Sequence, residues 1–294
     1  MEIYKKLETK YAKFVGDKYA VSCNSGTSAL HLVLMALGVT KDDEVIVPDF
    51  TMAACGFAVS YCNAKPVFVD CDDTFNIDVT KIEEKITKKT KVIMAVNIYG
   101  RCCNLKEIVR IARKHGLKVV LDACEAQGVV FKSEADIVCY SFYKNKIIHA
   151  EEGGMCTTNN KKYAEIMNHL KNMSFGPKHD YYHDEIGYNY RMPDTMAQMA
   201  LDSLKEFPKN KKKRKEFEKV WNKVIPTPKR DIMWVYDFLC EDEWDRDVKM
   251  QILKDKGFEV RYFFKPLSTM PMWKQEVGQK ALEFSKRGMY ICMK

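Results

Sequence analysis

The chain has 294 residues, of which 46% are hydrophobic and 30% charged, and its formal net charge is +8. This apolar content excludes an intrinsically disordered chain, and the length excludes a small disulfide-bonded domain. No apolar run approaches the ~18 residues that span a bilayer, and residues 1–6 lack a secretory signal, so we expect a soluble cytoplasmic protein with eleven reduced cysteines and no membrane partner.

The first two thirds of the chain alternate between helical and strand-like patterns. Residues 1–37 are mostly helical in pattern. Short apolar runs then predict strands at residues 44–48, 66–70, 91–96, 118–122 and 136–140, and a helix is predicted at residues 105–115. This alternation predicts an α/β domain with a mostly parallel sheet, in which ligands usually bind beyond the carboxyl ends of the strands.

The last third of the chain has a different pattern. After a long helical connection that contains Pro208, the pattern predicts a strand at residues 232–239, a helix at 246–256 and a strand at 258–264. We therefore expect a large α/β domain at residues 1–205 and a smaller α+β domain at residues 206–294, which includes the helical connection.

A basic run at residues 209–215 carries much of the positive charge. Such a run is compatible with a nucleic-acid patch or a targeting signal, and also with a solvated helix face. Glu206, Glu216 and Glu218 flank it and no aromatic residue lies within it, so we favour the solvated face and do not expect nucleic acid as a partner. The cysteines lack the spacing of zinc ligands, and no metal site is expected.

A turn of small residues at 24–29 runs directly into an apolar helix. The free N–H groups at the start of that helix, with Gly26 and the hydroxyls of Thr27 and Ser28, suit a phosphate group. The alternative is an ordinary N-cap, which also favours serine and threonine. The glycine-rich patterns of nucleotide-binding loops are absent.

Charged residues follow two of the predicted strands. Asp122 ends the fourth predicted strand, where an ionised carboxylate needs a cation, such as a protonated heterocyclic nitrogen, or several donors; alternatively, it caps the next helix. Lys144 and Lys146 lie between the fifth predicted strand and the glycine pair at residues 153–154. A lysine that is desolvated there would have a lowered pKa and could act as a nucleophile that forms a Schiff base, although most lysines are solvated surface groups.

Residues 187–192 combine aromatic rings with the amide of Asn189 and the guanidinium of Arg191. They precede an apolar-periodic helix at residues 194–204. The segment is either a packed loop or a cluster of donors for an anion.

In this order and spacing, these features resemble the DegT/StrS family of sugar aminotransferases, which are pyridoxal-phosphate enzymes of the aspartate-aminotransferase fold. The matching segments are residues 25–32, 43–48, 64–70, 76–78, 122–126, 141–146, 152–155, 187–192 and 261–267. The chain looks most like the branch that makes 4-amino-4,6-dideoxy sugars, the perosamine and viosamine synthases. The resemblance implies the α/β architecture of fold type I, with a large parallel-sheet domain and a smaller α+β domain.

The resemblance also implies roles for single residues. Lys146, not Lys144, aligns with the lysine that forms the Schiff base, and Asp122 aligns with the partner of the cofactor's ring nitrogen. Glu125 occupies the position beside the phenolic oxygen of the ring. The positions that align with the phosphate site are Gly26, Thr27, Ser28 and Ser141.

Further positions concern the partner subunit and the substrate. The family's counterpart of Asn189 reaches the phosphate across a dimer interface, which implies a homodimer with shared active sites, and Arg191 beside it could serve the same pocket. Arg261 is a candidate for a diphosphate or sugar contact, or else a surface arginine at a strand end. Many members stack an aromatic ring on the cofactor from the position of Met52, where a thioether covers the ring less rigidly.

The implied activity is transfer of an amino group from L-glutamate to C4 of a nucleotide-linked 4-keto-6-deoxyhexose, a UDP- or GDP-sugar, in amino-sugar and glycan biosynthesis. A related branch, a sugar 3-dehydratase, carries histidine at the position of Lys146, so the lysine favours transamination. The alternative is a cofactor-binding relative with a regulatory or assembly role. Two features motivate this alternative: Met52 replaces the usual aromatic ring, and family members usually have further segments before the position of Met1 and beyond that of Lys294. Every cofactor motif is present, so we expect cofactor binding.

Overall fold

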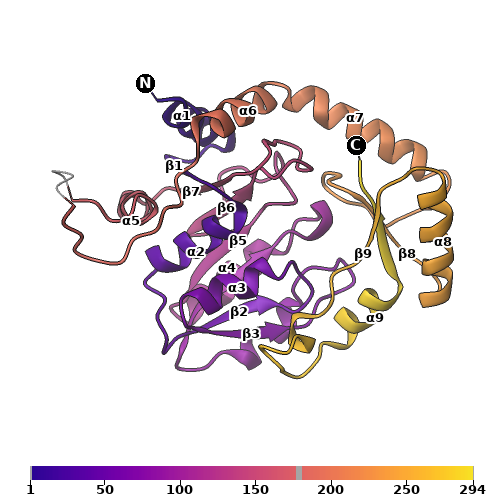
Figure 1. Ribbon diagram of the computed structural model, residues 1–294. Helices are drawn as coiled ribbons and strands as arrows, with labels where there is room; N and C mark the ends of the chain where they lie inside the picture. The colour runs from indigo at the N-terminus through magenta and orange to yellow at the C-terminus, as the bar shows by residue number, and fades with distance from the viewer. Residues whose placement is uncertain (1, 177–180, 294) are drawn as a thin grey trace.

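The computed structural model describes residues 2–176 and 181–293, which form a seven-stranded sheet with helices on both faces and a separate three-stranded sheet (Figure 1). The helices are α1 (Ile3–Val15), α2 (Gly26–Ala36), α3 (Ala54–Tyr61), α4 (Leu105–Lys114), α5 (Lys161–Lys171), α6 (Asp194–Lys205), α7 (Phe207–Trp221), α8 (Glu243–Asp255) and α9 (Gln279–Arg287). The strands are β1 (Tyr19–Cys23), β2 (Glu44–Pro48), β3 (Lys65–Val69), β4 (Thr90–Val96), β5 (Lys118–Asp122), β6 (Ile137–Ser141), β7 (Gly154–Thr158), β8 (Tyr236–Leu239), β9 (Val260–Tyr262) and β10 (Gly288–Ile291). Helix α7 arches from the side of the large sheet to the small one (Figure 1).

Five neighbouring strands of the large sheet are parallel, in the order β6, β5, β4, β2, β3. Strand β7 runs antiparallel beside β6, and β1 pairs antiparallel with β7 at the edge. The small sheet is antiparallel, in the order β8, β10, β9. The predicted α/β class, with a mostly parallel large sheet and a smaller sheet, is therefore confirmed. The carboxyl ends of the parallel strands meet at one edge, where a ligand site is expected.

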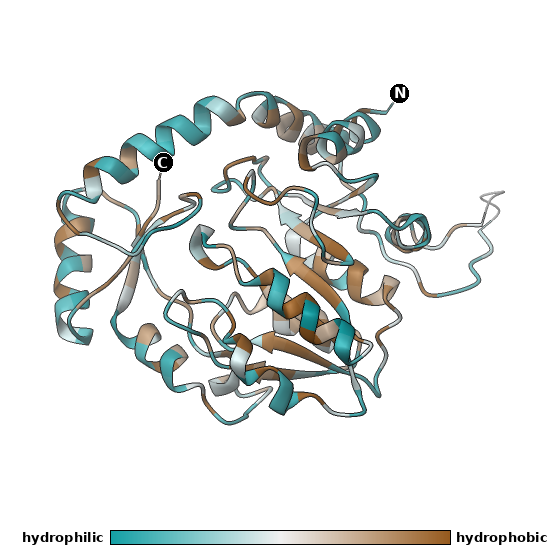
Figure 2. Cartoon of the chain, turned by 180° about the vertical axis from the view of Figure 1, so that it is seen from behind, coloured by the Kyte–Doolittle hydropathy of each residue, from teal (hydrophilic) through white to brown (hydrophobic). Residues whose placement is uncertain are grey.

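Side chains of the central strands alternate between two apolar layers, because successive residues of a strand point to opposite faces. In β4, Val92 and Met94 pack on the face covered by α2, α3 and α5, whereas Ile93 and Ala95 pack on the face covered by α1, α4 and α6. The central strands are apolar and enclosed by helices with polar outer faces (Figure 2). Trp234, which precedes the small sheet, joins the first layer, so this layer continues from one sheet to the other.

The five strands expected between residues 44 and 140 are present as β2 to β6, each within one residue of the expected bounds. The helices expected at 105–115, 194–204 and 246–256 are α4, α6 and α8. Three strands, β1, β7 and β10, were not expected: β1 is a half-buried edge strand inside the region of helical pattern, β7 begins at a glycine and ends in two threonines, and β10 has only four residues. The strand expected at 232–239 is shortened to β8, because the backbone of residues 231–232 bonds to another segment.

A tight turn at residues 98–101 follows β4 and joins the two sheets. Residues 231–232 bond to this turn. The Gly100 carbonyl accepts hydrogen bonds from the N–H groups of Asp231 and Ile232, at 3.0 and 3.1 Å. Tyr99 has a φ of +49° and Gly100 a φ of +80°, so both lie in the left-handed region. A Cβ on Gly100 would lie 1.7 Å from the Ile232 carbonyl oxygen, so the close approach requires glycine.

The next residue, Arg101, anchors a buried network of ion pairs. Its guanidinium lies 2.7 Å from the carboxylate of Asp237 in β8. Asp237 also pairs with Arg230 at 3.2 Å, and Arg230 lies 3.2 Å from Glu218 in α7. The side chains of Arg230 and Asp237 have no solvent exposure. The network therefore ties the large sheet, the small sheet and α7 together at their common boundary.

The eleven cysteines are free thiols, and all except Cys102 are buried. The ten buried cysteines pack as small apolar side chains. No helix in the described parts of the chain is long and apolar enough to cross a bilayer.

Replacing Asp237 by alanine tests the boundary network. The substitution leaves Arg101 and Arg230 buried without their shared carboxylate, and we expect the free energy of unfolding to fall by about 3–5 kcal/mol. Urea denaturation followed by circular dichroism measures this change. The control is Asp202→Ala, which removes an exposed ion pair with Lys205 and should leave the free energy of unfolding nearly unchanged. Equal losses in the two variants would contradict the role of the network.

Candidate active site

A cavity of about 430 Å³ lies at the carboxyl ends of β4, β5 and β6, between the large sheet and residues of the small one. Its polar lining includes Thr27, Thr51, Asp122, Glu125, Ser141, Asn145, Lys146, Glu152 and Arg261. Its apolar lining includes Met52, Trp234, Phe264 and Tyr290. The volume is that of a small-molecule site, and the cavity collects most of the residues that the sequence singles out.

The turn before α2 forms one end of the cavity. Ser25 is the N-cap, and its Oγ accepts a hydrogen bond from the Ser28 N–H at 3.1 Å. The N–H groups of Gly26 and Thr27 belong to the first turn, where a helix offers no internal acceptors. A Cβ on Gly26 would approach the Ser141 Cβ to 2.9 Å, so glycine keeps the space between this turn and the end of β6 free. The helix start and the hydroxyls of Thr27 and Ser141 can thus hold a phosphate.

Ser28 is turned away from the cavity and does not line it. Its hydroxyl donates to Asn24 Oδ1 at 2.6 Å and lies 2.8 Å from Ser25 Oγ. These contacts stabilise the turn itself, as the N-cap alternative expects. Direct binding of the phosphate by Ser28 stays a prediction.

Asp122 places a buried carboxylate at the end of β5. Its Oδ1 accepts a hydrogen bond from the Cys124 N–H at 2.9 Å, and its Oδ2 accepts one from the Cys55 thiol at 3.5 Å. Both donors are neutral, so the carboxylate still suits a cation such as a protonated ring nitrogen. It does not cap a helix, because the chain continues after β5 as turns.

Glu125 lies in the turn that follows β5 and is buried. Its Oε2 accepts a hydrogen bond from the Tyr99 N–H at 2.7 Å. Burial raises the pKa of Glu125 from its ordinary value of 4.5 to about 7, against the opposing effects of the Lys146 charge and of that N–H group. A carboxyl group that titrates near neutral pH can share a proton with a phenolic oxygen.

Lys146 is the lysine of the cavity, whereas Lys144 is exposed. The side chain of Lys146 is buried, and its Nζ lies 3.6 Å from the centroid of the Trp234 ring. A cation over the face of an indole is attracted by the negative charge of that face. Trp234 carries no signal in the sequence, because its contact with Lys146 joins two segments that are distant along the chain.

Met52 and Arg261 lie at the mouth of the cavity. The Met52 side chain lines the cavity and is 55% exposed, whereas the nearby Phe50 is fully buried and does not line it. The exposed guanidinium of Arg261 donates to Glu259 Oε1 from Nε and Nη2, at 3.2 and 2.7 Å. A surface guanidinium of this kind can turn toward an incoming anion.

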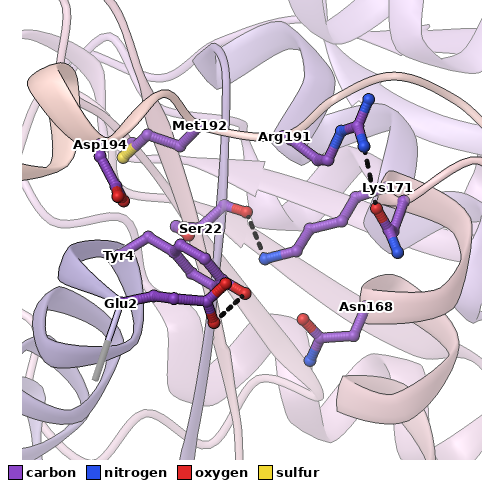
Figure 3. Close-up of a pocket in the computed structure, with 9 residues that line it drawn as sticks. Glu2, Tyr4, Ser22, Asn168, Lys171, Arg191, Met192 and Asp194 are labelled. Carbon is purple, nitrogen blue, oxygen red and sulfur yellow. Dashed lines mark hydrogen bonds between the residues drawn. The ribbon is translucent and has the colours of Figure 1, made fainter.

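Asn189 and Arg191 do not line this cavity. The Asn189 carbonyl accepts a hydrogen bond from Asn24 Nδ2 at 3.4 Å, so the segment lies behind the turn before α2 of its own chain. Arg191 lines a second cavity of about 610 Å³ together with Lys171, and donates to Asn172 Oδ1 at 3.4 Å (Figure 3). A contribution of Asn189 to the site of a partner subunit stays a prediction.

The first cavity fits pyridoxal phosphate by the chemistry of its groups. The start of α2 suits the phosphate, and the Asp122 carboxylate suits a protonated ring nitrogen. The Glu125 carboxyl group suits the phenolic oxygen, and the Lys146 amine suits the reactive carbon. Two polar atoms of the lining, Asn145 Oδ1 and Trp234 Nε1, are buried without a hydrogen-bond partner among the described residues. Buried polar groups are normally satisfied, so these atoms indicate that polar groups of a ligand complete the site.

The comparisons with known proteins agree with this geometry. A sequence model of the DegT/DnrJ/EryC1/StrS aminotransferase family matches residues 2–293. GDP-perosamine synthase of Escherichia coli O157:H7 is 37% identical over 286 residues, which cover 92% of this chain and 79% of that protein. UDP-N-acetyl-3-dehydro-alpha-D-glucosamine 3-aminotransferase of Acidithiobacillus ferrooxidans is 40% identical over 209 residues, which cover 69% of this chain and 55% of that protein.

Solved structures share the arrangement of both sheets. Spr1654 of Streptococcus pneumoniae, in its PMP form, superposes with a TM-score of 0.92 at 25% identity, over 99% of this chain and 85% of that chain. The fold expected from the resemblance is therefore confirmed.

The raised pKa of Glu125 predicts a pH dependence of stability in the cofactor-free protein. Between pH 4.5 and 7 the unfolded carboxyl group ionises while the folded one keeps its proton, so the free energy of unfolding falls as the pH rises. The pKa difference of about 2.5 corresponds to a total loss of about 3 kcal/mol, of which about 2 kcal/mol falls between pH 5 and pH 7. Glu125→Gln keeps an acceptor for the Tyr99 N–H but cannot ionise. Urea denaturation at pH 5 and pH 7 should show a smaller loss in this variant, and identical losses would contradict the assignment.

Proposed function

The chain belongs to the DegT/DnrJ/EryC1/StrS aminotransferase family, and we propose that it transfers the amino group of L-glutamate to C4 of a nucleotide-linked 4-keto-6-deoxyhexose, a GDP- or UDP-sugar. The product would be a 4-amino-4,6-dideoxy sugar. The observation that carries this proposal is the single cavity in which Asp122, Glu125 and Lys146 meet the start of α2. Relatives named as nucleotide-sugar aminotransferases support an enzyme of this class.

The choice of C4 and of a GDP-sugar is supported by the extent of similarity. GDP-perosamine synthase aligns along more of this chain than the UDP-sugar 3-aminotransferase does. At the mouth of the cavity, the planar fork of Arg261 suits a diphosphate. The rings of Phe264 and Tyr290 provide apolar surface beside it, against which the faces of a sugar can pack.

Pyridoxal 5′-phosphate is the cofactor of this family, and its electron-withdrawing ring stabilises the negative charge that develops at Cα of the amino donor. The residues of the chain hold this group and control protons around it. Asp122 would keep the ring nitrogen protonated, and Thr27 and Ser141 would hold the phosphate with the helix start. Glu125 would share its proton with the phenolic oxygen.

Lys146 is the amine that moves the reacting proton in this proposal. As a general base, Lys146 takes the proton from Cα of L-glutamate. As a general acid, Lys146 then gives up this proton to complete the removal of the amino group from the donor. With the keto sugar the order is reversed, and the final proton goes to C4 of the sugar. Trp234 lies against the Lys146 amine and excludes water from that side of it.

We also propose a homodimer with shared active sites. Asn189 lies behind the turn before α2 of its own chain and outside the cavity, so within one chain it does not reach the phosphate end. Its family counterpart acts across the dimer interface, and a two-fold arrangement would place each Asn189 at the site of the partner subunit.

Lys146→Ala tests the central role. Because the variant lacks the amine that moves the proton, we expect kcat to fall by about 10⁴-fold and the visible absorption band of the bound cofactor to change. The assay couples L-glutamate to GDP- and UDP-linked 4-keto-6-deoxyhexoses, and nuclear magnetic resonance of the product shows whether the amine is at C4. A wild-type enzyme that accepts no 4-keto sugar would refute the proposed substrate.

The matched control is Lys144→Ala, two residues away and outside the cavity. This variant should keep the activity and the spectrum of the wild type, since Lys144 is exposed. Loss of activity in Lys144→Ala with activity retained in Lys146→Ala would reverse the assignment of the lysine.

Mixing two inactive variants tests the shared site. Co-expressed Lys146→Ala and Asn189→Ala chains form mixed dimers in which one of the two sites has both residues, if Asn189 acts on the partner subunit. Random pairing should then restore about a quarter of the wild-type activity. If Asn189 acts within its own chain, no site in the mixed dimer is complete and the activity stays at the level of the separate variants.

A further inference from the structure

The basic run at residues 209–215 lies on α7, and its side chains divide between two faces. Its lysines are exposed, as expected for a solvated face. Asn210 and Arg214, the two residues of the run that are not lysine, face inward and, being four positions apart, share one side of the helix. Asn210 Nδ2 donates to the Ile147 carbonyl at 3.3 Å, which brings this side of α7 to the loop that carries the active-site lysine.

Arg214 bonds to two separate segments of the active site at once. Its Nη2 donates to the carbonyl oxygens of Asn145 and Lys146, at 3.2 and 3.4 Å. Its Nη1 donates to the carbonyl oxygen of Trp234. The guanidinium therefore connects the backbone of the lysine to the backbone of the indole that the lysine amine faces.

The charge of Arg214 is costly to bury. Its side chain is buried, and this burial lowers the pKa of the guanidinium to about 10, so it remains charged at neutral pH. The described contacts of its guanidinium are carbonyl oxygens rather than a carboxylate. An apolar side chain of similar length would fill the space without this cost, which indicates that the position requires the fixed fork of donors.

Other contacts hold the lysine loop to the large sheet. Gln127 exchanges two hydrogen bonds with the backbone of Ile148, at 2.8 and 3.0 Å. His149 Nδ1 lies 3.2 Å from the Lys146 carbonyl oxygen. These contacts fix the loop but do not reach Trp234, whereas Arg214 reaches both.

We propose that Arg214 is a positioning residue for Lys146: by bonding the carbonyls of Lys146 and Trp234 together, it fixes the 3.6 Å separation between the lysine amine and the indole ring. The inference rests on the proposed function, in which Lys146 moves the reacting proton. Without the guanidinium, the loop and the segment before β8 can shift independently. A shift of about 1 Å is enough to lower the rate of the chemical step by about 100-fold.

The test compares the full-length wild type with Arg214→Lys, Arg214→Met and, as a matched control, Lys213→Met on the exposed face. The first readout is acetylation of Lys146 by acetic anhydride in the cofactor-free protein, measured by peptide mass spectrometry relative to Lys144. The second is kcat and KM for L-glutamate at saturating cofactor.

We expect Lys146 to react several-fold faster in Arg214→Met than in the wild type, because the amine is no longer held against the ring. We expect kcat to fall by about 10- to 100-fold while KM for L-glutamate changes by less than about threefold. Arg214→Lys, which keeps the charge but not the fork, should be intermediate in both readouts, and Lys213→Met should match the wild type.

A variant that melts at a lower temperature but keeps the wild-type acetylation of Lys146 and the wild-type kcat would overturn the proposal and leave Arg214 a structural role. If Arg214→Met does not fold, the same comparison with Arg214→Lys decides. Faster acetylation of Lys146 in a protein whose wild type transaminates no sugar would support the positioning role and refute the proposed function instead.

Discussion

The left-handed turn at residues 98–101 is the constraint on which the rest of the active site depends. The Tyr99 N–H of this turn donates a hydrogen bond to Glu125, and the Gly100 carbonyl accepts hydrogen bonds from the N–H groups of residues 231–232. Arg101 forms an ion pair with Asp237. A non-glycine residue in this conformation costs about 1–2 kcal/mol, which the contacts on either side offset. The cavity exists because this turn holds the small sheet over the carboxyl ends of the large one.

This arrangement separates the chemistry from the choice of substrate. The large sheet contributes Asp122 at the end of β5 and, from the loops after β5 and β6, Glu125 and Lys146. The small sheet and its approaches supply Arg261 and Tyr290 at the open side. Under the proposed function, substitutions in the small sheet can therefore change which sugar is bound while the residues assigned to proton transfer stay in place.

The sequence predicts what is local and misses what depends on distant contacts. The apolar runs of β2 to β6 are visible because both faces of those strands are buried, and the residues that end β5 and β6 follow from the parallel order. Ser28 illustrates the limit, since only the structure shows its hydroxyl directed to Asn24. Trp234 and Arg214 lie in segments with no periodic signal for a site, because their roles come from packing against a loop far away in the chain. Arg214 in particular lies in a run of lysines that carry the same charge. The lysines are exposed, whereas the Arg214 side chain is buried, and only the structure shows this difference.

The pairing of β1 with β7 has a consequence for the order of assembly during synthesis. Strand β1 is made before β7, and this hydrogen-bonding partner follows only after residues 24–153. Non-local pairing of this kind is slow, because a long loop must close before the contact is gained. The turn proposed to receive the phosphate follows β1 directly, so this end of the cavity is the last part of the large sheet to be fixed. The large sheet of a newly made chain would therefore be completed by the pairing of β1 with β7. Cofactor bound next to β1 would stabilise the sheet in which these two strands are paired over the one in which they are not.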